Sequence, residues 1–292
     1  MCSSDLGQVC NLFEKAEFVK GDILDSQHLE KTMAQGFDAV IHLAAKKAVG
    51  ESMENPQLYS QNNISGSVNI FNAMLNTGIK NIVFSSTSAV YGMPQYLPLD
   101  ENHPLNPMSF YGYTKMAIEQ VMNWYSKIKD FNYIALRYFN AVGYAADGSI
   151  RSKEKNPQNL LPLIMETITG QREILHVFGN DYDTPDGTCV RDYIHVEDLA
   201  DAHVLAIKKL LSNGDSQIIN LGTEKGTSVL EIIKSVERVS GKKVNYDFAP
   251  RRAGDPANVI ATSAKAAEVL GWHAKYTDID EIVKTVWNIE KC

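Results

Sequence analysis

The sequence predicts an α/β protein with a doubly wound parallel sheet, followed by a smaller α/β domain. Two observations carry this prediction. Apolar runs such as 37–45 and 81–85 alternate with amphipathic helical stretches such as 56–76 and 109–129, the order that builds parallel β-α-β units. With 292 residues, 44% of them hydrophobic and 22% charged, the chain is long and apolar enough for a large buried core.

The first part of the chain is expected to supply most of the sheet. Ser26 is a plausible N-cap, Pro56 suits the first turn of a helix, and Gly78 suits a helix end. The expected elements are strand 16–20, helix 26–34, strand 37–45, helix 56–76, strand 81–85, helix 109–129 and strand 132–138.

The second part predicts the smaller domain. We place the boundary near Asn140, so that residues 1–140 form one domain and 141–292 the other, with 190–211 returning to the first. The polar loop 144–158 is long enough to predict ligand binding or disorder. The expected elements are helix 160–169, a strand ending at 177–182, helix 197–211, strand 218–222, helix 229–240, strand 244–248 and helices 263–270 and 279–290.

Hydroxyl side chains follow the apolar run 81–84. Ser85, Ser86, Thr87 and Ser88 come where a buried strand is expected to end. Ligands of open α/β sheets bind at the carboxyl ends of the strands. The sequence therefore predicts a functional site at this edge of the sheet.

Tyr111 and Lys115 open the helix expected at 109–129. Because they are four residues apart, they share one helix face, which brings an ammonium near a phenol. A nearby cation favours the phenolate, which is a general base. The same pair also occurs by chance on exposed helices, but the hydroxyls at the strand end favour a catalytic interpretation.

These segments resemble the extended branch of the short-chain dehydrogenase/reductase family, and within it the UDP-glucose (UDP-galactose) 4-epimerases. The resemblance runs from about Phe18 to Trp287. Besides 85–92 and 111–115, two strings are typical of the family: Val-Arg-Asp-Tyr-Ile-His-Val at 190–196 and Ala-Pro-Arg-Arg-Ala-Gly-Asp at 249–255. The implied fold is a Rossmann-type domain followed in the sequence by a UDP-sugar-binding domain.

The resemblance implies an NAD-dependent isomerase that interconverts UDP-galactose and UDP-glucose through a transient 4-keto sugar. In this scheme Tyr111 takes the proton of the 4-hydroxyl, Lys115 lowers the pKa of Tyr111 and binds the nicotinamide ribose, and Thr87 bonds the reacting hydroxyl. Ser88 is a lesser candidate for the role of Thr87, which could also be only a strand-end cap. The expected pathway is galactose metabolism, a branch of carbohydrate metabolism.

The implied cofactor contacts lie along the first domain. Lys46 is expected to be solvated rather than to bind, and Tyr138 could equally be a core residue. The cofactor-binding candidates are Asp22, Ile23, Leu43, Ala44, Ala45, Lys47, Asn62, Ser85, Tyr111, Lys115 and Tyr138.

The implied substrate contacts lie mostly in the second domain. Arg191 and Arg252 suit a diphosphate, because the guanidinium is planar and permanently charged. The substrate-binding candidates are Thr87, Asn140, Asn159, Leu160, Phe178, Arg191, Arg252 and Asp255.

One departure from the family is that no Gly-rich dinucleotide-binding turn occurs before Asp22. We therefore expect that the first βαβ unit is missing, that 1–9 is not native sequence, that NAD affinity is low, and that the sheet has an aggregation-prone edge. The alternatives are a truncated, non-catalytic fragment that still binds UDP-sugar, or another NAD-dependent nucleotide-sugar epimerase or dehydratase. The related dehydratases carry Thr-Asp-Glu where this chain has Thr-Ser-Ala at 87–89.

Charge and cysteine content indicate the partners and the compartment. A net charge of −7 argues against a broad nucleic-acid-binding face. The sequence contains no run of 18 apolar residues, so no membrane span is expected. The cysteines do not have the spacing of metal ligands. We expect a cytoplasmic protein, and the family suggests a homodimer that pairs helices 56–76 and 109–129. The cysteines, expected to be free thiols, are Cys2, Cys10, Cys189 and Cys292.

Overall fold

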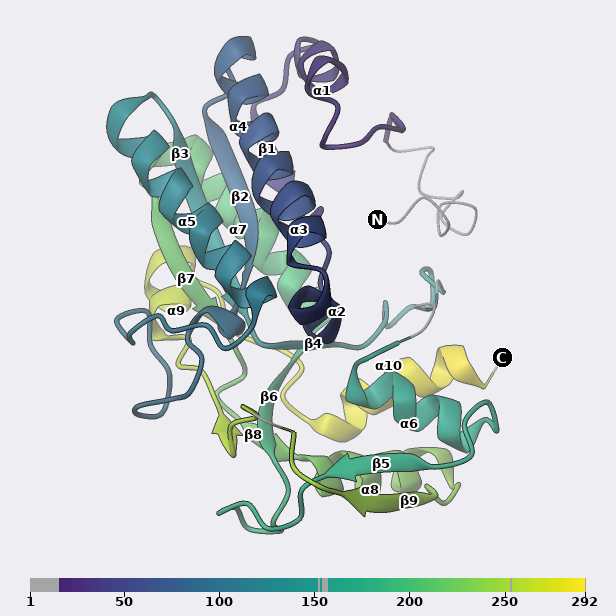
Figure 1. Cartoon of the computed structure of the whole chain (residues 1–292). Coiled ribbons are helices and arrows are strands. Elements are labelled where there is room, and N and C mark those ends of the chain that lie inside the picture. Colours follow the sequence, from purple (N-terminus) through teal and green to yellow (C-terminus); the bar gives the residue numbers. More distant parts are fainter. Residues whose placement is uncertain (1–15, 152, 154–156, 253, 292) are drawn as a thin grey trace.

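The computed structural model describes residues 16–151, 153, 157–252 and 254–291. Its main sheet has four strands, all parallel, in the order β1-β2-β3-β7 (Figure 1). The doubly wound α/β prediction is confirmed. The strands are β1 (Ala39–His42), β2 (Asn81–Thr87), β3 (Asn132–Tyr138) and β7 (Gln217–Leu221).

Helices cover both faces of this sheet (Figure 1). Successive residues of β2 point to opposite faces, so Ile82 and Phe84 pack with α4 and α5, whereas Val83 packs with α7 and α9. Both faces are therefore buried, as a parallel sheet requires. The covering helices are α4 (Gly66–Thr77) and α5 (Phe110–Ile128) on one side and α7 (Val196–Asn213) and α9 (Ala264–Leu270) on the other.

The helix expected at 56–76 is in fact three consecutive segments. α3 (Pro56–Tyr59) is followed by a π-helix (Ser60–Ser65) and then by α4, which ends at Gly78 with φ +78°. A further helix, α2 (Val49–Glu54), precedes them. π-Helical turns inside α-helices occur frequently at functional sites, and this one carries the candidate residue Asn62.

The second part of the chain packs below the main sheet (Figure 1). Its core lies between three helices and two small sheets, with Ile164, Val177 and Val283 fully buried. β10, β6 and β4 run parallel, β8 is antiparallel to β6, and β5 pairs with β9. The elements are β4 (Asn140–Val142), α6 (Leu160–Ile168), β5 (Leu175–Phe178), β6 (Val190–His195), β8 (Gly226–Ser228), α8 (Val229–Ser240), β9 (Tyr246–Ala249), β10 (Asn258–Val259) and α10 (Ile279–Glu290).

Two expectations for the N-terminal region are wrong. The segment 16–20 is not a strand and joins none of the described sheets, and its residues Phe18 and Val19 are 47% and 40% exposed. α1 (Ser26–Met33) is capped by Asp25 rather than Ser26, because the Asp25 carboxylate accepts a hydrogen bond from the His28 backbone N–H.

Of the described strands, β1 lies at the edge of the main sheet. It is shorter than the expected 37–45, because only Ala39–His42 pair with β2, and beyond it the backbone of Lys46 bonds the side chain of Asn63. Ile41 of β1 is 45% exposed, and Leu43, which follows the strand, is 56% exposed.

Among the described residues, no helix is both long and apolar enough to cross a bilayer, and no group of three or more His, Cys, Asp or Glu side chains could hold a metal ion. Cys189 is a buried free thiol. Cys2, Cys10, Cys292 and the 1–9 segment lie outside the described residues, as do parts of the loop 144–158.

Candidate active site

The carboxyl end of β2 forms one wall of the site. Thr87 is the last residue of β2, and its hydroxyl accepts a hydrogen bond from the Ala89 N–H at 3.2 Å, which starts the short 3-10 turn that follows. Across the sheet Thr87 lies opposite Tyr138 of β3. The polar end of β2 thus faces the polar end of β3.

The start of α5 is held against this wall. Ser109 caps the helix by accepting from the Gly112 N–H at 3.1 Å, and Ser52 of α2 accepts from the Tyr111 N–H at 3.0 Å. A side chain at Gly112 would lie 2.5 Å from the Ala89 carbonyl oxygen, so glycine permits this close approach. The packing brings Tyr111 within hydrogen-bonding reach of Thr87.

Lys115 lies one turn further along α5 and is only 2% exposed. Its Nζ donates to the Ser85 carbonyl oxygen at 2.7 Å and lies 3.4 Å from the Ser85 hydroxyl. The same Nζ is 4.6 Å from the centre of the Phe84 ring and 5.9 Å from that of Tyr111. Tyr111, Lys115, Ser85, Thr87 and Tyr138 are therefore brought together as the sequence predicted.

Burial dominates the electrostatics of this pair. Burial raises the pKa of Tyr111, with the neighbouring Tyr138 adding to the rise and the Thr87 hydrogen bond opposing it. Burial also lowers the pKa of Lys115 to about 7, although the charge of Glu119 opposes that fall. In this structure the loss of hydration is the main influence on the pKa of Tyr111, and the lowering of that pKa by Lys115 stays a prediction.

The other cofactor candidates of this half lie beside α5. Asn63 of the π-helix holds the loop after β1 through Lys46 and also donates to the Thr114 hydroxyl at 3.2 Å. Asn62 donates to the Asn63 carboxamide oxygen at 3.0 Å. Along the same loop Leu43 and Lys47 are exposed, whereas Ala44 and Ala45 are half-buried.

Asp22 and Ile23 lie elsewhere, against α4. The Ile23 carbonyl accepts from Asn69 at 3.1 Å, and its side chain fills the space in which a side chain at Gly66 would stand. The Asp22 carboxylate accepts from the Leu24 N–H at 2.9 Å.

The substrate candidates of the second part form two contacts. The Arg252 guanidinium lies over the Phe178 ring, 3.9 Å from its centre. Arg191 donates to the Asp255 carboxylate at 2.5 Å. Asn140 is in β4, Asn159 is the exposed N-cap of α6, and Leu160 packs against the core of this part.

The residues at the strand ends fit the nicotinamide half of NAD. A lysine ammonium carries three N–H groups, and Ser85 supplies one close acceptor at 2.7 Å and one distant contact at 3.4 Å, which leaves a donor for a ribose hydroxyl. The neighbouring Ala44 and Ala45 leave the backbone after β1 open to close approach. The buried Nε2 of His203, whose ring lies edge-on to Tyr138, has no protein partner among the described residues.

Several residues of this site were not identified from the sequence. Ser52 and Asn63 are fully buried polar side chains that fix the position of α5, and no local motif marks them. Glu119 and Arg137 form a buried ion pair behind Lys115. The spacing of Glu119, four residues after Lys115, and a charge inside the apolar run of β3 were signals that could have revealed this pair.

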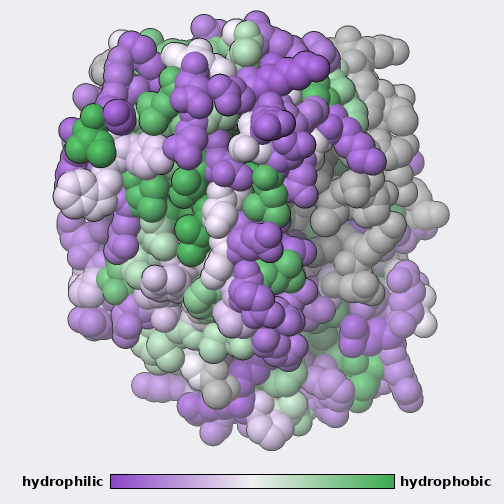
Figure 2. Space-filling model, turned by 45° about the horizontal axis from the view of Figure 1, so that its top comes forward, coloured by the Kyte–Doolittle hydropathy of each residue, from purple (hydrophilic) through white to green (hydrophobic). Residues whose placement is uncertain are grey.

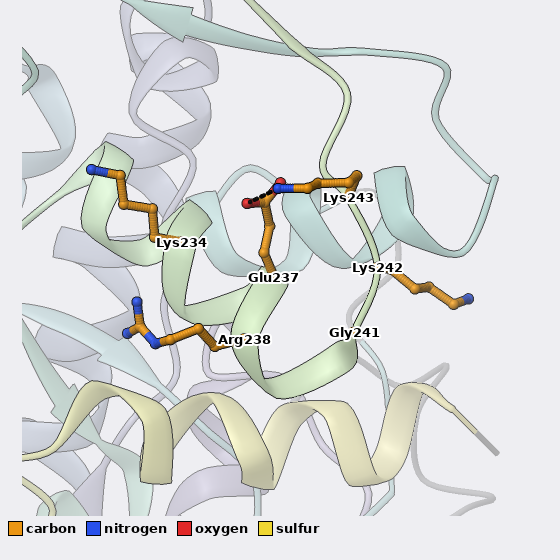
Figure 3. Close-up of a pocket in the computed structure, with 6 residues that line it drawn as sticks. All are labelled: Lys234, Glu237, Arg238, Gly241, Lys242 and Lys243. Carbon is orange, nitrogen blue, oxygen red and sulfur yellow. Dashed lines mark hydrogen bonds and ion pairs between the residues drawn. The ribbon is translucent and has the colours of Figure 1, made fainter.

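A separate surface hollow of about 360 Å³ lies at the end of α8, away from these residues (Figure 3). Its basic side chains point in different directions: Arg238 bonds Asp280, and Lys243 bonds Glu237. It is therefore a charged surface rather than a convergent site. The residues that line it are Lys234, Glu237, Arg238, Gly241, Lys242 and Lys243.

Comparison with known proteins gives close relatives. A protein-family model described as GDP-mannose 4,6 dehydratase matches residues 4–286. A UDP-glucose 4-epimerase of Lactobacillus helveticus is 43% identical over 278 residues, which are 95% of this chain and 84% of that protein. A bifunctional UDP-glucose 4-epimerase and UDP-xylose 4-epimerase of Arabidopsis thaliana is 46% identical over 285 residues, 95% of this chain and 80% of that one.

Solved structures agree with these relatives. The chain superposes on a UDP-glucose 4-epimerase of Stenotrophomonas maltophila, solved with NAD and formylated UDP-arabinopyranose, with a TM-score of 0.95 and 38% identity over 100% of this chain and 88% of that chain. For the Brucella ovis UDP-glucose 4-epimerase in complex with NAD, the TM-score is 0.90 at 45% identity, over 92% and 83% of the two chains.

Proposed function

The chain belongs to the UDP-glucose 4-epimerases of the extended short-chain dehydrogenase/reductase family, and from this premise we propose that Tyr111, Lys115 and Thr87 carry its reaction. The enzyme is an NAD-dependent isomerase that interconverts UDP-galactose and UDP-glucose. The observation that supports this assignment of residues is the pairing of half-buried Tyr111 with buried Lys115 at the carboxyl end of β2.

Tyr111 is the general base of this proposal. Its phenolate removes the proton of the 4-hydroxyl of the sugar, and the resulting phenol returns a proton to O4 when the sugar is reduced. Thr87, hydrogen-bonded to Tyr111, orients the hydroxyl that loses the proton. Because burial raises the pKa of Tyr111, the phenolate needs positive charge close by when the ligands are bound.

Bound NAD supplies the reversible oxidation at C4, and the 4-keto sugar is the transient species. Lys115 binds the nicotinamide ribose, and its ammonium keeps its hydrogen bond to the Ser85 carbonyl oxygen. The remaining cofactor contacts of the proposal are Asp22, Ile23, Leu43, Ala44, Ala45, Lys47, Asn62, Ser85 and Tyr138.

The second part of the chain is proposed to hold the UDP group. Arg252, with its guanidinium on Phe178, and Arg191, with its guanidinium on Asp255, offer two positive charges for a diphosphate. Fixing the UDP group leaves the sugar free to turn and present either face of C4. Asn140, Asn159 and Leu160 complete the proposed substrate contacts.

The residues at 87–89 favour epimerisation over dehydration. Thr87 is followed by Ser88 and Ala89, which have no acid to help remove water from the sugar. A dehydratase needs such a group for its general acid–base chemistry.

We also propose a homodimer and a cytoplasmic location. Figure 2 shows apolar residues gathered in a band over the part of the surface where Figure 1 places α4 and α5. On α5 the exposed side chains include Tyr113 at 46%, Trp124 at 62% and Ile128 at 65%, on one side of the helix. Pairing two copies through this face would bury them.

The test measures NAD content and turnover separately. The full chain is saturated with NAD, freed of unbound ligand and denatured, and the released dinucleotide is assayed; conversion of UDP-galactose to UDP-glucose is followed on the same preparation. About one NAD per chain with turnover in both directions would support the proposed function and would contradict the low NAD affinity expected from the absent Gly-rich turn. Bound UDP-sugar without NAD or turnover would instead indicate a non-catalytic binding protein.

A further inference from the structure

A buried ion pair lies directly behind the proposed catalytic residues. Glu119 of α5 and Arg137 of β3 are each only 2% exposed. The Arg137 Nε and Nη2 donate to the two carboxylate oxygens of Glu119 at 2.9 and 2.6 Å, a bidentate pair. The Ser86 hydroxyl donates to the same carboxylate at 2.5 Å. Glu119 is thus fixed by two neighbouring strands of the main sheet.

Glu119 shares a helix face with the proposed catalytic residues. Tyr111, Lys115 and Glu119 follow one another at intervals of four along α5. Neighbours at this spacing lie about 5–6 Å apart at their Cβ atoms. The Glu119 carboxylate opposes the fall that burial causes in the pKa of Lys115.

The pair extends to the rest of the molecule through Arg137. Its Nη1 donates to the Tyr91 hydroxyl at 3.0 Å, and that hydroxyl donates to the Asn220 side chain of β7 at 2.6 Å. Asn220 in turn donates to the Leu99 carbonyl at 3.1 Å. The position of the carboxylate is therefore set by strand and loop contacts rather than by its own rotamer freedom.

We infer that Glu119 is a positioning residue for Lys115: its carboxylate, held by Arg137 and Ser86, favours the charged form of the buried ammonium that the Ser85 carbonyl holds at the end of β2. This inference rests on the proposed catalytic role of Lys115. A buried lysine without a counter-charge tends to lose its proton, so a catalytic lysine at this depth needs such a neighbour.

Other charged or titratable groups also face Lys115. On α5 and β3 they are Tyr111 and Tyr138, both with pKa values raised by burial. On β1 it is His42, whose pKa is lowered to about 3, mainly by burial and also by the charge of Lys115. None of these carries a negative charge at neutral pH, so Glu119 is the carboxylate that acts on Lys115.

The experiment measures the pKa of Lys115 directly in two variants, which should shift this pKa in opposite directions. The full chain is labelled with ¹³C at the lysine Cε, and the Lys115 signal is assigned by its loss in Lys115→Met. Glu119→Gln removes the negative charge and should lower the pKa of Lys115 by about one pH unit. Arg137→Met removes the cation that shares the carboxylate and should raise the pKa of Lys115.

A kinetic signature accompanies the titration. At neutral pH, Glu119→Gln should lower kcat about fivefold, because a one-unit fall from a pKa of about 7 cuts the charged fraction of Lys115 from about a half to about a tenth, with KM for the UDP-sugar little changed. Its kcat should recover partly at lower pH, where Lys115 regains its proton. A merely structural role would lower activity without this recovery.

The inference is overturned if both single variants fold and shift the Lys115 titration in the same direction, or if neither shifts it. Removing one partner of a buried pair can prevent folding, whereas replacing both is better tolerated. If the single variants do not fold, Glu119→Gln/Arg137→Met decides: the lost cation offsets part of the lost carboxylate, so a Lys115 pKa lowered by less than about one unit supports the inference, and a pKa at or above the wild-type value overturns it.

Glu166→Gln is the matched control. Glu166 also binds an arginine through two N–H groups, Arg172 Nε at 3.1 Å and Nη2 at 3.0 Å, but in α6 of the second part. Glu166→Gln should leave the pKa of Lys115 unchanged. Because the titration needs neither NAD nor turnover, its outcome is independent of whether the proposed function is correct.

Discussion

The ion pairs of the two halves of the molecule differ in burial. In the main sheet domain, the side chains of Arg137 and Glu119 are 2% and 3% exposed. In the second part, those of Arg191 and Asp255 are 14% and 28% exposed. A buried pair fixes geometry at a high desolvation cost, whereas a partly hydrated pair can exchange its partner for a ligand phosphate. The first region suits proton transfer and the second suits binding.

The largest expected effect is a loss of catalysis in the main sheet domain. Tyr111→Phe removes the proposed base, so kcat for the epimerisation should fall by about 10²–10⁴-fold, the usual contribution of a general base. KM for the UDP-sugar should change little. The measurement is a steady-state assay with UDP-galactose. The control is Tyr113→Phe, an exposed tyrosine of the same helix, and equal losses in both variants would contradict the role of Tyr111.

The next effect separates two adjacent arginines of the second region. Arg252 lies over Phe178, whereas Arg251 bonds Asp181 and lies over Tyr182. Arg252→Ala should raise KM about 10- to 100-fold with kcat nearly unchanged, the loss expected when a charged hydrogen bond to a phosphate is removed.

Arg251→Ala, measured in the same assay, should leave KM within about twofold of the wild type, since Arg251 is not among the proposed substrate contacts and exposed ion pairs contribute little. The assignment of Arg252 fails if the two variants exchange these results.

A smaller effect concerns stability and pH in the first region. Burial lowers the pKa of Lys115 from its ordinary value of 10.5 to about 7, so the native state binds fewer protons than the unfolded state between these values. Stability should therefore rise with pH across this window, and this contribution is lost as the pH falls through about 7.

Urea unfolding at pH 7 and pH 9 of the wild type and of Lys115→Met measures this effect. The wild type should gain on the order of 1–2 kcal/mol relative to the variant between the two pH values. Parallel pH profiles would mean that Lys115 is not desolvated in solution.

The smallest effect is expected from an exposed pair of the second region. Arg238 bonds the Asp280 carboxylate with both partners partly exposed. Arg238→Ala should lower the free energy of unfolding by less than about 1 kcal/mol, as is usual for surface pairs. Thermal unfolding of this variant gives the baseline for the buried pair, and a loss comparable to that of Glu119→Gln would contradict the distinction drawn between the regions.

The sequence predicted long, periodic elements better than isolated ones. β3, α8 and α10 have the predicted bounds, because each has a strong apolar pattern and clear ends. The strand expected at 16–20 is wrong, since a strand is stabilised by its neighbours and local propensity does not report them. The division of the chain near Asn140 stays a prediction.

The candidate site shows the same limit. The proximity of motif residues such as Tyr111, Thr87 and Lys115 could be predicted from their spacing and from the strand order. The pKa of Tyr111 could not be predicted, because it depends on how far the folded chain removes the phenol from water. Asn63 and Ser52 were missed for a related reason: each fixes α5 from a distant segment, and nothing in the local sequence marks that contact.

The π-helix at Ser60–Ser65 works as a spacer of one extra residue between two helical segments. A π-helix bonds residue i to residue i+5 rather than i+4, so its wider turn takes up the extra residue and α3 and α4 keep nearly the same angular relation. Deleting Gln61 should let the turn revert to α-helix with α3 and α4 almost in place. The turn itself would be rebuilt, and Asn63, which now donates to the Lys46 carbonyl and the Thr114 hydroxyl, would lose these contacts. In this segment, shortening the chain by one residue should therefore harm the site more than most substitutions would.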